Sequence, residues 1–163
     1  MKSSEIIKTL GLIAHPEGGY FKEIYRNKEE ISDRELVQKY SGKRQLATSI
    51  YFLLESGQVS KLHQLKSDEL WYFHHGSPLI VHQFNEGEYT SIVLGPNIDK
   101  DESCQVIIPA GTIFGAEVKD HNSFTLIGCL VSPGFHFDDF RLVSYQEVMQ
   151  QFPSCEAIIS KLT

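Results

Sequence analysis

The sequence predicts an all-β domain with short helices at its two ends. Between residues 46 and 131, short segments rich in Val, Ile, Leu, Phe, Tyr and Thr alternate with Gly, Pro, Asn or Asp. Such segments at a spacing of roughly 8–12 residues are typical of a β-sandwich or barrel. Asn85-Glu86-Gly87 and Pro109-Ala110-Gly111 are turn signals between them. The predicted strands cover 46–55, 60–65, 69–75, 79–84, 89–94, 104–108, 112–118 and 123–131.

A helix and an aromatic strand are predicted before this β body. Residues 3–10 are predicted to be helical, with Ser3 or Ser4 as the cap and Gly11 as the stop. The motif HPEGGYFKEIYR follows, and its residues 20–25 are predicted to form a strand rich in aromatic side chains.

Helices are also predicted inside a polar segment and at the C-terminus. Residues 27–45 are highly charged and contain the spacing of a capping box, which favours a short surface helix. Ser144 and Glu147 have the same spacing, Pro153 interrupts the helix that they begin, and residues 154–161 resume it. We expect the terminal helices to pack on the outside of the β body.

Composition excludes several classes of function. The 163 residues suit one compact domain, 1–163. Fifteen Lys and Arg against 21 Asp and Glu give a net charge of −6, which argues against nucleic acid as a partner. The sequence contains no apolar run of the roughly 18 residues that span a membrane, and no signal peptide. Three cysteines without a C-x-x-C pair fit a cytoplasmic protein without disulfides.

The stretch GQVSKLHQLKSDELWYFHHG resembles the first motif of the cupin superfamily. That motif is Gly, five residues, His, one residue, His, three or four residues, Glu, six residues and Gly. Gly57, His63, Glu69 and Gly76 are in register with it, but Leu65 occupies the second His position.

The second cupin motif is matched only in part. It reads Gly, five residues, Pro, one residue, Gly, two residues, His, three residues and Asn. Ser103, Pro109 and Gly111 are in register with it. Phe114 stands at the His position and Val118 at the Asn position.

A narrower resemblance extends over almost the whole chain. HPEGGYFKEIYR, TSIYFLL, HQLKSDELWYFHHG, IPAGTIFGA and GCLVSPGFHFDDF look like the signatures of one cupin branch. The resemblance implies a single-domain jelly roll, that is, a double-stranded β-helix likened to the dTDP-sugar epimerases, and a homodimer. His136 departs from the pattern, because an acidic residue is expected there.

The resemblance also raises the question of a metal. Cupin metal sites use three His and one Glu or Gln, and of these only His63 and Glu69 remain. Leu and Phe have no lone pair to donate, and catalytic metal sites need about three protein ligands. We therefore expect neither a metal nor another cofactor, unless His82 or His136 completes a non-standard ligand set.

Without a metal, the motif predicts an aromatic pocket. Side chains alternate along a strand, so Glu69 shares one face with two aromatic residues, and the cupin register turns that face inward. A His–Glu pair among aromatic and apolar walls matches the usual character of a small-molecule site. The predicted ligand-binding residues are His63, Glu69, Trp71, Phe73, Leu65 and Phe114.

Three roles for the His63–Glu69 pair stay open. It is a buried structural pair, or part of a site that binds a small organic molecule such as a carbohydrate-like one, or the acid/base machinery of an epimerase or isomerase with His63 as general base. Tyr51 is a further catalytic candidate if it faces the pocket. In the alternative, Thr48, Ile50 and Phe52 face inward and Tyr51 faces outward.

The N-terminal motif has two interpretations. His15, Glu17 and Arg26 form either a charged rim for an anionic ligand or a structural turn held by Gly18-Gly19, and the turn is favoured. The expected partners are a small molecule and a second copy of the chain, the latter through the aromatic strand, because exposed sheet edges invite pairing.

Overall fold

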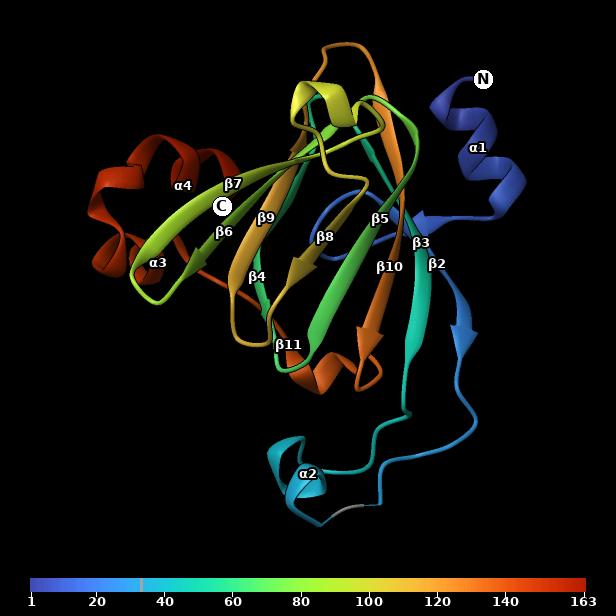
Figure 1. Cartoon of the computed structure of the whole chain (residues 1–163), viewed down its shortest axis with the longest axis vertical. Helices are drawn as coiled ribbons and strands as arrows, with labels where there is room; N and C mark the ends of the chain where they lie inside the picture. The colour runs from blue at the N-terminus through green and yellow to red at the C-terminus, as the bar shows by residue number, and fades with distance from the viewer. Residues whose placement is uncertain (33) are drawn as a thin grey trace.

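The computed structural model describes residues 1–32 and 34–163, and it contains two antiparallel β-sheets (Figure 1). The first sheet is, in spatial order, β1 (Ile13–Ala14), β2 (Tyr20–Arg26), β3 (Thr48–Glu55), β10 (Phe124–Ser132), β5 (Asp68–Gly76) and β8 (Gln105–Ile108). The second sheet is β11 (Phe140–Leu142), β4 (Val59–Leu65), β9 (Ile113–Val118), β6 (Leu79–Asn85) and β7 (Glu88–Leu94). The predicted all-β jelly roll, a double-stranded β-helix, is confirmed.

The strands lie where the alternation of apolar residues and turn signals places them. Strands β6 and β7 form a hairpin in which Asn85 pairs with Glu88. Glu86 and Gly87 between them have φ of 50° and 81°, and two consecutive left-handed residues are what a tight hairpin turn requires.

Helix α1 (Ser3–Leu10) matches the predicted first helix, but its cap differs. Lys2, rather than Ser3 or Ser4, is the N-cap, because the Glu5 carboxylate accepts a hydrogen bond from the Lys2 backbone N–H at 2.8 Å. Ser3 instead donates to Glu55 on β3.

The other helices confirm the remaining predictions. The short surface helix is α2 (Arg34–Lys39), and Ser144 caps α3 (Tyr145–Gln151) by accepting from the Glu147 N–H. The turn η3 (Pro153–Cys155) separates α3 from α4 (Glu156–Leu162). Two further turns are η1 (Ile98–Lys100) and η2 (Phe137–Asp139). No helix in the described residues is long and apolar enough to cross a membrane.

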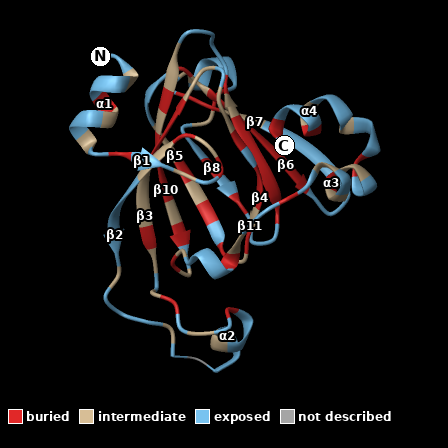
Figure 2. Cartoon of the chain, turned by 180° about the vertical axis from the view of Figure 1, so that it is seen from behind, coloured by how far each residue is buried: buried red, intermediate tan, exposed pale blue. Residues whose placement is uncertain are grey.

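The hydrophobic core lies between the two sheets, and the terminal helices cover the outer faces (Figure 2). Leu53 of β3 is fully buried on the outer face of the first sheet, where α1 packs with Ile6. Helices α3 and α4 cover the second sheet, where Val148 and Leu162 pack against Leu62 of β4. The Leu62 side chain of β4 therefore points to the outer face of the second sheet, and the other face of β4 points to the interior.

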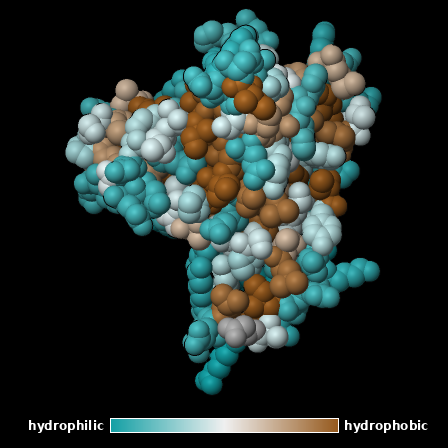
Figure 3. Space-filling view, viewed as in Figure 1, coloured by the Kyte–Doolittle hydropathy of each residue, from teal (hydrophilic) through white to brown (hydrophobic). Residues whose placement is uncertain are grey.

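The homodimer stays a prediction, and the exposed strand edges indicate where to test it. Beyond Phe21, strand β2 pairs only with β3, and its Ile24 and Tyr25 are about half exposed. Ile107 on the edge strand β8 is 58% exposed, and Figure 3 shows hydrophobic side chains gathered around β8. We expect light scattering to give twice the chain mass, and Tyr25→Lys to shift the protein toward the monomer. Wild-type protein that is monomeric at micromolar concentration would contradict this prediction.

Candidate functional site

A cavity of about 190 Å³ opens between the sheets, at the end of the barrel where η2 lies. Nine of the 18 lining side chains carry rings: five Phe, Trp71 and three His. Three glutamates and Arg26 are the charged members. This space is many times what a single water needs, roughly 10–15 Å³ on the same measure, so it can hold a small molecule.

His63 reaches the cavity floor because strand β4 is bulged. The pairing with β9 shifts between Ser60 and His63, and both side chains face inward. His63 Nδ1 lies 2.6 Å from the Lys61 carbonyl oxygen. A carbonyl only accepts, so Nδ1 carries the proton and the lone pair of neutral His63 is on Nε2.

Glu17 is the direct partner of that lone pair. Its Oε2 lies 3.2 Å from His63 Nε2, and its Oε1 accepts a hydrogen bond of 2.8 Å from Ser60 Oγ. Burial raises the pKa of Glu17 to about 6, opposed by His15 and by the Ser60 hydrogen bond. Two acceptor atoms at this distance need a proton between them. The Glu17 carboxyl and the His63 imidazole therefore share one proton.

The turn in HPEGGY forces Glu17 inward. Gly18 has φ +113°, and a Cβ on it would lie 2.2 Å from the Val59 carbonyl oxygen of β4. A Cβ on Gly19 would lie 2.7 Å from the Leu53 carbonyl oxygen. Only glycine allows the turn to pack this closely against both sheets, and this contact carries the Glu17 side chain to Ser60.

Replacing Gly18 by Ala is therefore expected to lower the free energy of unfolding by about 2 kcal/mol or more, since strain and a backbone clash add. Chemical denaturation measures the loss. Gly87→Ala is the matched control, because Gly87 also has a positive φ but has no atom within 4 Å of the added Cβ. Equal losses in the two variants would show that the contact with Val59 is unimportant.

Glu69 of β5 lies deeper in the cavity beside Trp71 and Cys129. Burial raises the pKa of Glu69 to about 7, His63 opposes the rise, and the nearby Glu17 adds to it. The Trp71 indole nitrogen is buried without a hydrogen bond of regular geometry in the described chain, although it lies close enough to lower the pKa of Glu69. Near neutral pH, the floor thus presents two carboxyls that titrate between about 6 and about 7, and an unused N–H donor.

His15 lies among aromatic rings above this floor. Its ring contacts Phe21 edge-on at 4.7 Å and stacks on Phe137 at 6.4 Å. Its Nδ1 accepts from the Glu17 backbone N–H at 3.3 Å and lies 3.4 Å from Glu17 Oε2. Burial lowers the pKa of His15, as it does that of His63, so both imidazoles favour the neutral form.

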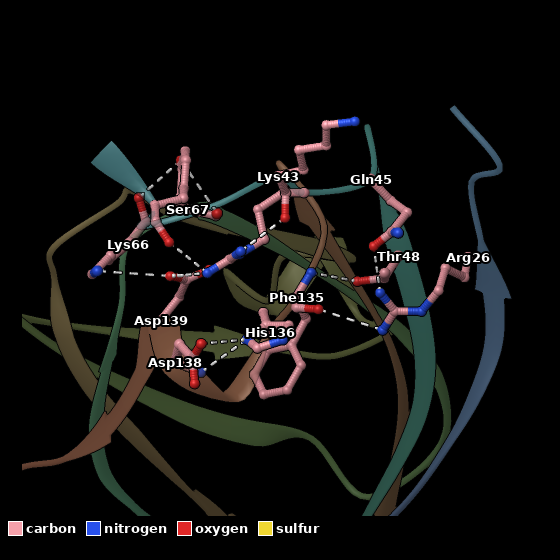
Figure 4. A network of polar contacts seen from close by, with 12 residues as sticks. Arg26, Lys43, Gln45, Thr48, Lys66, Ser67, Phe135, His136, Asp138 and Asp139 are labelled. Carbon is pink, nitrogen blue, oxygen red and sulfur yellow. Dashed lines mark hydrogen bonds and ion pairs between the residues drawn. The ribbon is translucent and has the colours of Figure 1, made fainter. Parts of the chain in front are cut away.

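The cavity mouth is formed by the segment 133–140, which a buried ion pair anchors (Figure 4). Arg44 binds both Asp139 carboxylate oxygens, at 2.6 and 3.0 Å, and both side chains are almost fully buried. The Phe135 N–H donates to Thr48 Oγ1 of β3 at 2.9 Å. These contacts hold Phe135, His136, Phe137 and Phe140 against the opening.

Comparison with known proteins identifies the family. Residues 4–143 match the model of the family described as Cupin superfamily (DUF985). The chain belongs to the cupin superfamily. A solved protein of Shewanella oneidensis is 40% identical to this cupin, with a TM-score of 0.88 over 100% of this chain and 98% of that one. A solved hypothetical protein of Leishmania major is 32% identical, with a TM-score of 0.89 over 100% and 99%. An uncharacterised protein of Saccharomyces cerevisiae is 26% identical, over 90% of this chain and 77% of that one.

The residues present do not fit the metal site that cupins are expected to carry. Leu65 and Phe114 occupy two of its ligand positions, and among the described residues no group of three or more His, Cys, Asp or Glu is arranged to hold a metal ion. His82, offered as a substitute ligand, lies outside the cavity, with Nδ1 2.9 Å from the Tyr89 hydroxyl. His136 does line the cavity, but it lies at the mouth and is half exposed.

The structure brings together most of the predicted site. His63, Leu65, Glu69 and Trp71 all line the cavity. Phe114 lies behind His63, with ring centroids 4.0 Å apart, and is part of the core.

Besides Phe114, two predicted residues lie outside the cavity. Phe73 points inward but farther along β5, where it packs against the core. Tyr51 is on the outer face of β3 and packs near α1, while Thr48, Ile50 and Phe52 line the cavity. The outward alternative for Tyr51 is therefore confirmed, and its placement does not fit a proton donor in the pocket.

The predicted pairing of His63 with Glu69 needs correction. In the described chain no hydrogen bond or ion pair joins them, and Glu17 takes that place. His15, Glu17 and Arg26 all line the cavity, and Gly18 and Gly19 form the turn of the second interpretation. The anionic ligand stays a prediction. The glycine pair after Glu17 was the available signal, because such a turn packs where no side chain fits.

Proposed function

We propose that this cupin binds a small organic molecule in the cavity, without a metal. The proposal is supported above all by the shared proton of Glu17 and His63, at the floor of a cavity whose walls are aromatic. Polar groups that can donate or accept at such a floor fix the orientation of a ligand, and the rings supply apolar contact area. Leu65 and Phe114, which cannot bind a metal, occupy two cupin ligand positions and support the metal-free form of this proposal.

The size of the cavity supports a ligand no larger than a single sugar ring. A fully enclosed nucleotide would need several times the volume of about 190 Å³. Binding is thus proposed for one small ring or branched group, with any longer substituent left outside the mouth formed by residues 133–140.

Trp71 provides the readout, since it is the single tryptophan of the chain and lines the cavity. A panel of small sugars, amines, acids and alcohols is tested for thermal shift and for a change in Trp71 emission. A ligand at 100 times its Kd stabilises the fold by about 2.7 kcal/mol, which a thermal shift detects.

The control fills the cavity. Val131 of β10 faces it, so Val131→Phe is expected to abolish binding, whereas Leu130→Phe, on the neighbouring outward position, is expected to retain it. No response to any compound class, or equal responses in both variants, would contradict the proposal.

Acid/base catalysis is the second candidate, favoured by the contact between His63 Nε2 and Glu17 Oε2. A group with a pKa of about 6 is well placed to exchange protons at neutral pH. An epimerase or isomerase would use His63 as the base that removes a proton next to a carbonyl. Glu69 would be the acid in place of Tyr51. Deuterium uptake from heavy water into small keto sugars tests this role. Uptake that is equal in wild type and His63→Gln would exclude His63 as the base.

A further inference from the structure

The two buried carboxyls of the cavity lack a cationic side chain. Arg26 is the only Lys or Arg among the described lining residues. Its guanidinium binds both oxygens of Glu23, at 2.9 and 2.7 Å. It also donates to Gln45 and to the Phe135 carbonyl (Figure 4). Arg26 is thus already neutralised at the mouth, and among the described residues no Lys or Arg side chain is left to pair with Glu17 and Glu69.

The imidazoles do not supply the missing charge. His63 donates its Nδ1 proton to the Lys61 carbonyl, and His15 uses Nδ1 to accept from the Glu17 N–H. Both rings are packed against Phe side chains, which disfavours the imidazolium form. The Glu17–His63 contact can hold one proton, but it adds no net positive charge to the cavity.

The walls offer a second feature that cations recognise. Phe52 and Trp71 stack at 6.2 Å, and Phe21, Phe137 and Phe140 surround His15. The face of an aromatic ring attracts a cation within about 6 Å of its centre, and cages of such rings are the usual sites for quaternary ammonium groups. Among the described residues, no three His, Cys, Asp or Glu side chains are arranged to hold a metal ion.

We infer that the ligand is a small organic cation, such as an alkylammonium or quaternary ammonium compound, held between the aromatic walls and the Glu17 and Glu69 carboxylates. This inference rests on the proposed function, which it narrows to one charge class. The ligand supplies the counter-charge that the chain lacks, and its alkyl groups fill the apolar part of the cavity.

Cation binding is coupled to proton release. Both carboxyls hold a proton more tightly than usual because they are buried, and a bound cation favours their ionised form. Affinity therefore increases as pH rises from about 5 to about 8, by at most tenfold per pH unit for each proton released. A neutral ligand would show no such increase.

The experiment compares choline with the neutral alcohol in which a carbon atom replaces the choline nitrogen. The two compounds have the same shape, and Trp71 emission reports occupancy of the cavity for both. At pH 8, we expect choline to bind about tenfold more tightly than the neutral alcohol. We expect choline itself to bind less tightly at pH 5 than at pH 8. Calorimetry in two buffers of different ionisation enthalpy measures the protons released.

Variants separate charge from shape. Glu69→Gln and Glu17→Gln are each expected to weaken choline binding about tenfold and to change binding of the neutral alcohol by less than about threefold. Retained binding of the neutral alcohol shows that the cavity of the variant is intact. Glu88→Gln, at an exposed position on β7, is the matched control and should bind choline like wild type.

The outcomes distinguish the two proposals. Equal or tighter binding of the neutral alcohol in wild type overturns the inference of a cation and leaves the proposed function standing. Choline binding that Glu69→Gln and Glu17→Gln leave unchanged also overturns it. If neither compound binds and an uncharged member of the panel does, the charge class is wrong; if nothing binds, both proposals are wrong.

Discussion

Glu69→Gln is expected to raise the free energy of unfolding by up to about 3 kcal/mol at pH 8 and to leave it nearly unchanged near pH 4. Burial raises the pKa of Glu69 from 4.5 to about 7, so the folded state holds its proton more tightly than the unfolded state does. The resulting stabilisation is complete below the unfolded pKa and is lost as pH rises through about 7. Gln resembles the protonated carboxyl and cannot ionise, so the variant escapes this loss.

The buried histidines also make stability depend on pH. The difference in unfolding free energy between variant and wild type is therefore more informative than the pH dependence of either protein alone. Burial lowers the pKa of His15 and of His63 from 6.5, so they destabilise the fold as pH falls below that value. Wild-type stability is therefore expected to pass through a maximum in weakly acidic solution. Urea denaturation at several pH values gives both curves, with Glu88→Gln as the exposed control. A variant effect that is independent of pH would show that Glu69 has the same pKa in the folded and unfolded states, and would contradict the prediction.

Arg44→Met is expected to cost about 3–5 kcal/mol of stability, because it leaves the Asp139 carboxylate buried without its main partner. Lys66 Nζ, 3.7 Å from Asp139 Oδ1, compensates for part of the charge. The double variant Arg44→Met/Asp139→Leu removes both charges and is expected to recover most of the loss. Equilibrium denaturation measures all three proteins.

An exposed pair provides the control for this experiment. Arg141 binds both oxygens of Glu147, at 3.0 and 2.7 Å, with similar geometry but with both side chains more than one-third exposed. Arg141→Met should therefore cost less than about 1 kcal/mol. Because Asp139 anchors the cavity mouth, Arg44→Met should also weaken ligand binding. Equal costs at positions 44 and 141 would contradict the role of burial.

The strands were predictable because a short segment between turn signals leaves the chain few alternatives. Alternation fixed which faces of β4 and β5 point inward, and so placed His63, Leu65, Glu69 and Trp71. The same rule leaves a strand's inward face undecided when both faces are apolar. Tyr51 illustrates this, since α1 covers part of the outer face of β3 and leaves a tyrosine there partly buried.

The Glu17–His63 contact was beyond sequence reasoning, because it depends on two departures from regular structure. One is the bulge in β4, which shifts the inward register between Ser60 and His63. The other is the close approach of the turn at Gly18 to the Val59 carbonyl. The residues that meet in these contacts are more than 40 positions apart in the sequence, so no local pattern encodes the contacts.

A crystal structure of the protein soaked with the tightest compound of the panel tests the central claim most directly. We expect the compound to lie against Trp71 and Phe52, within hydrogen-bond or ion-pair distance of Glu17 or Glu69. A metal ion coordinated by His63 and these carboxylates, or a compound bound elsewhere while the cavity is collapsed, would contradict it.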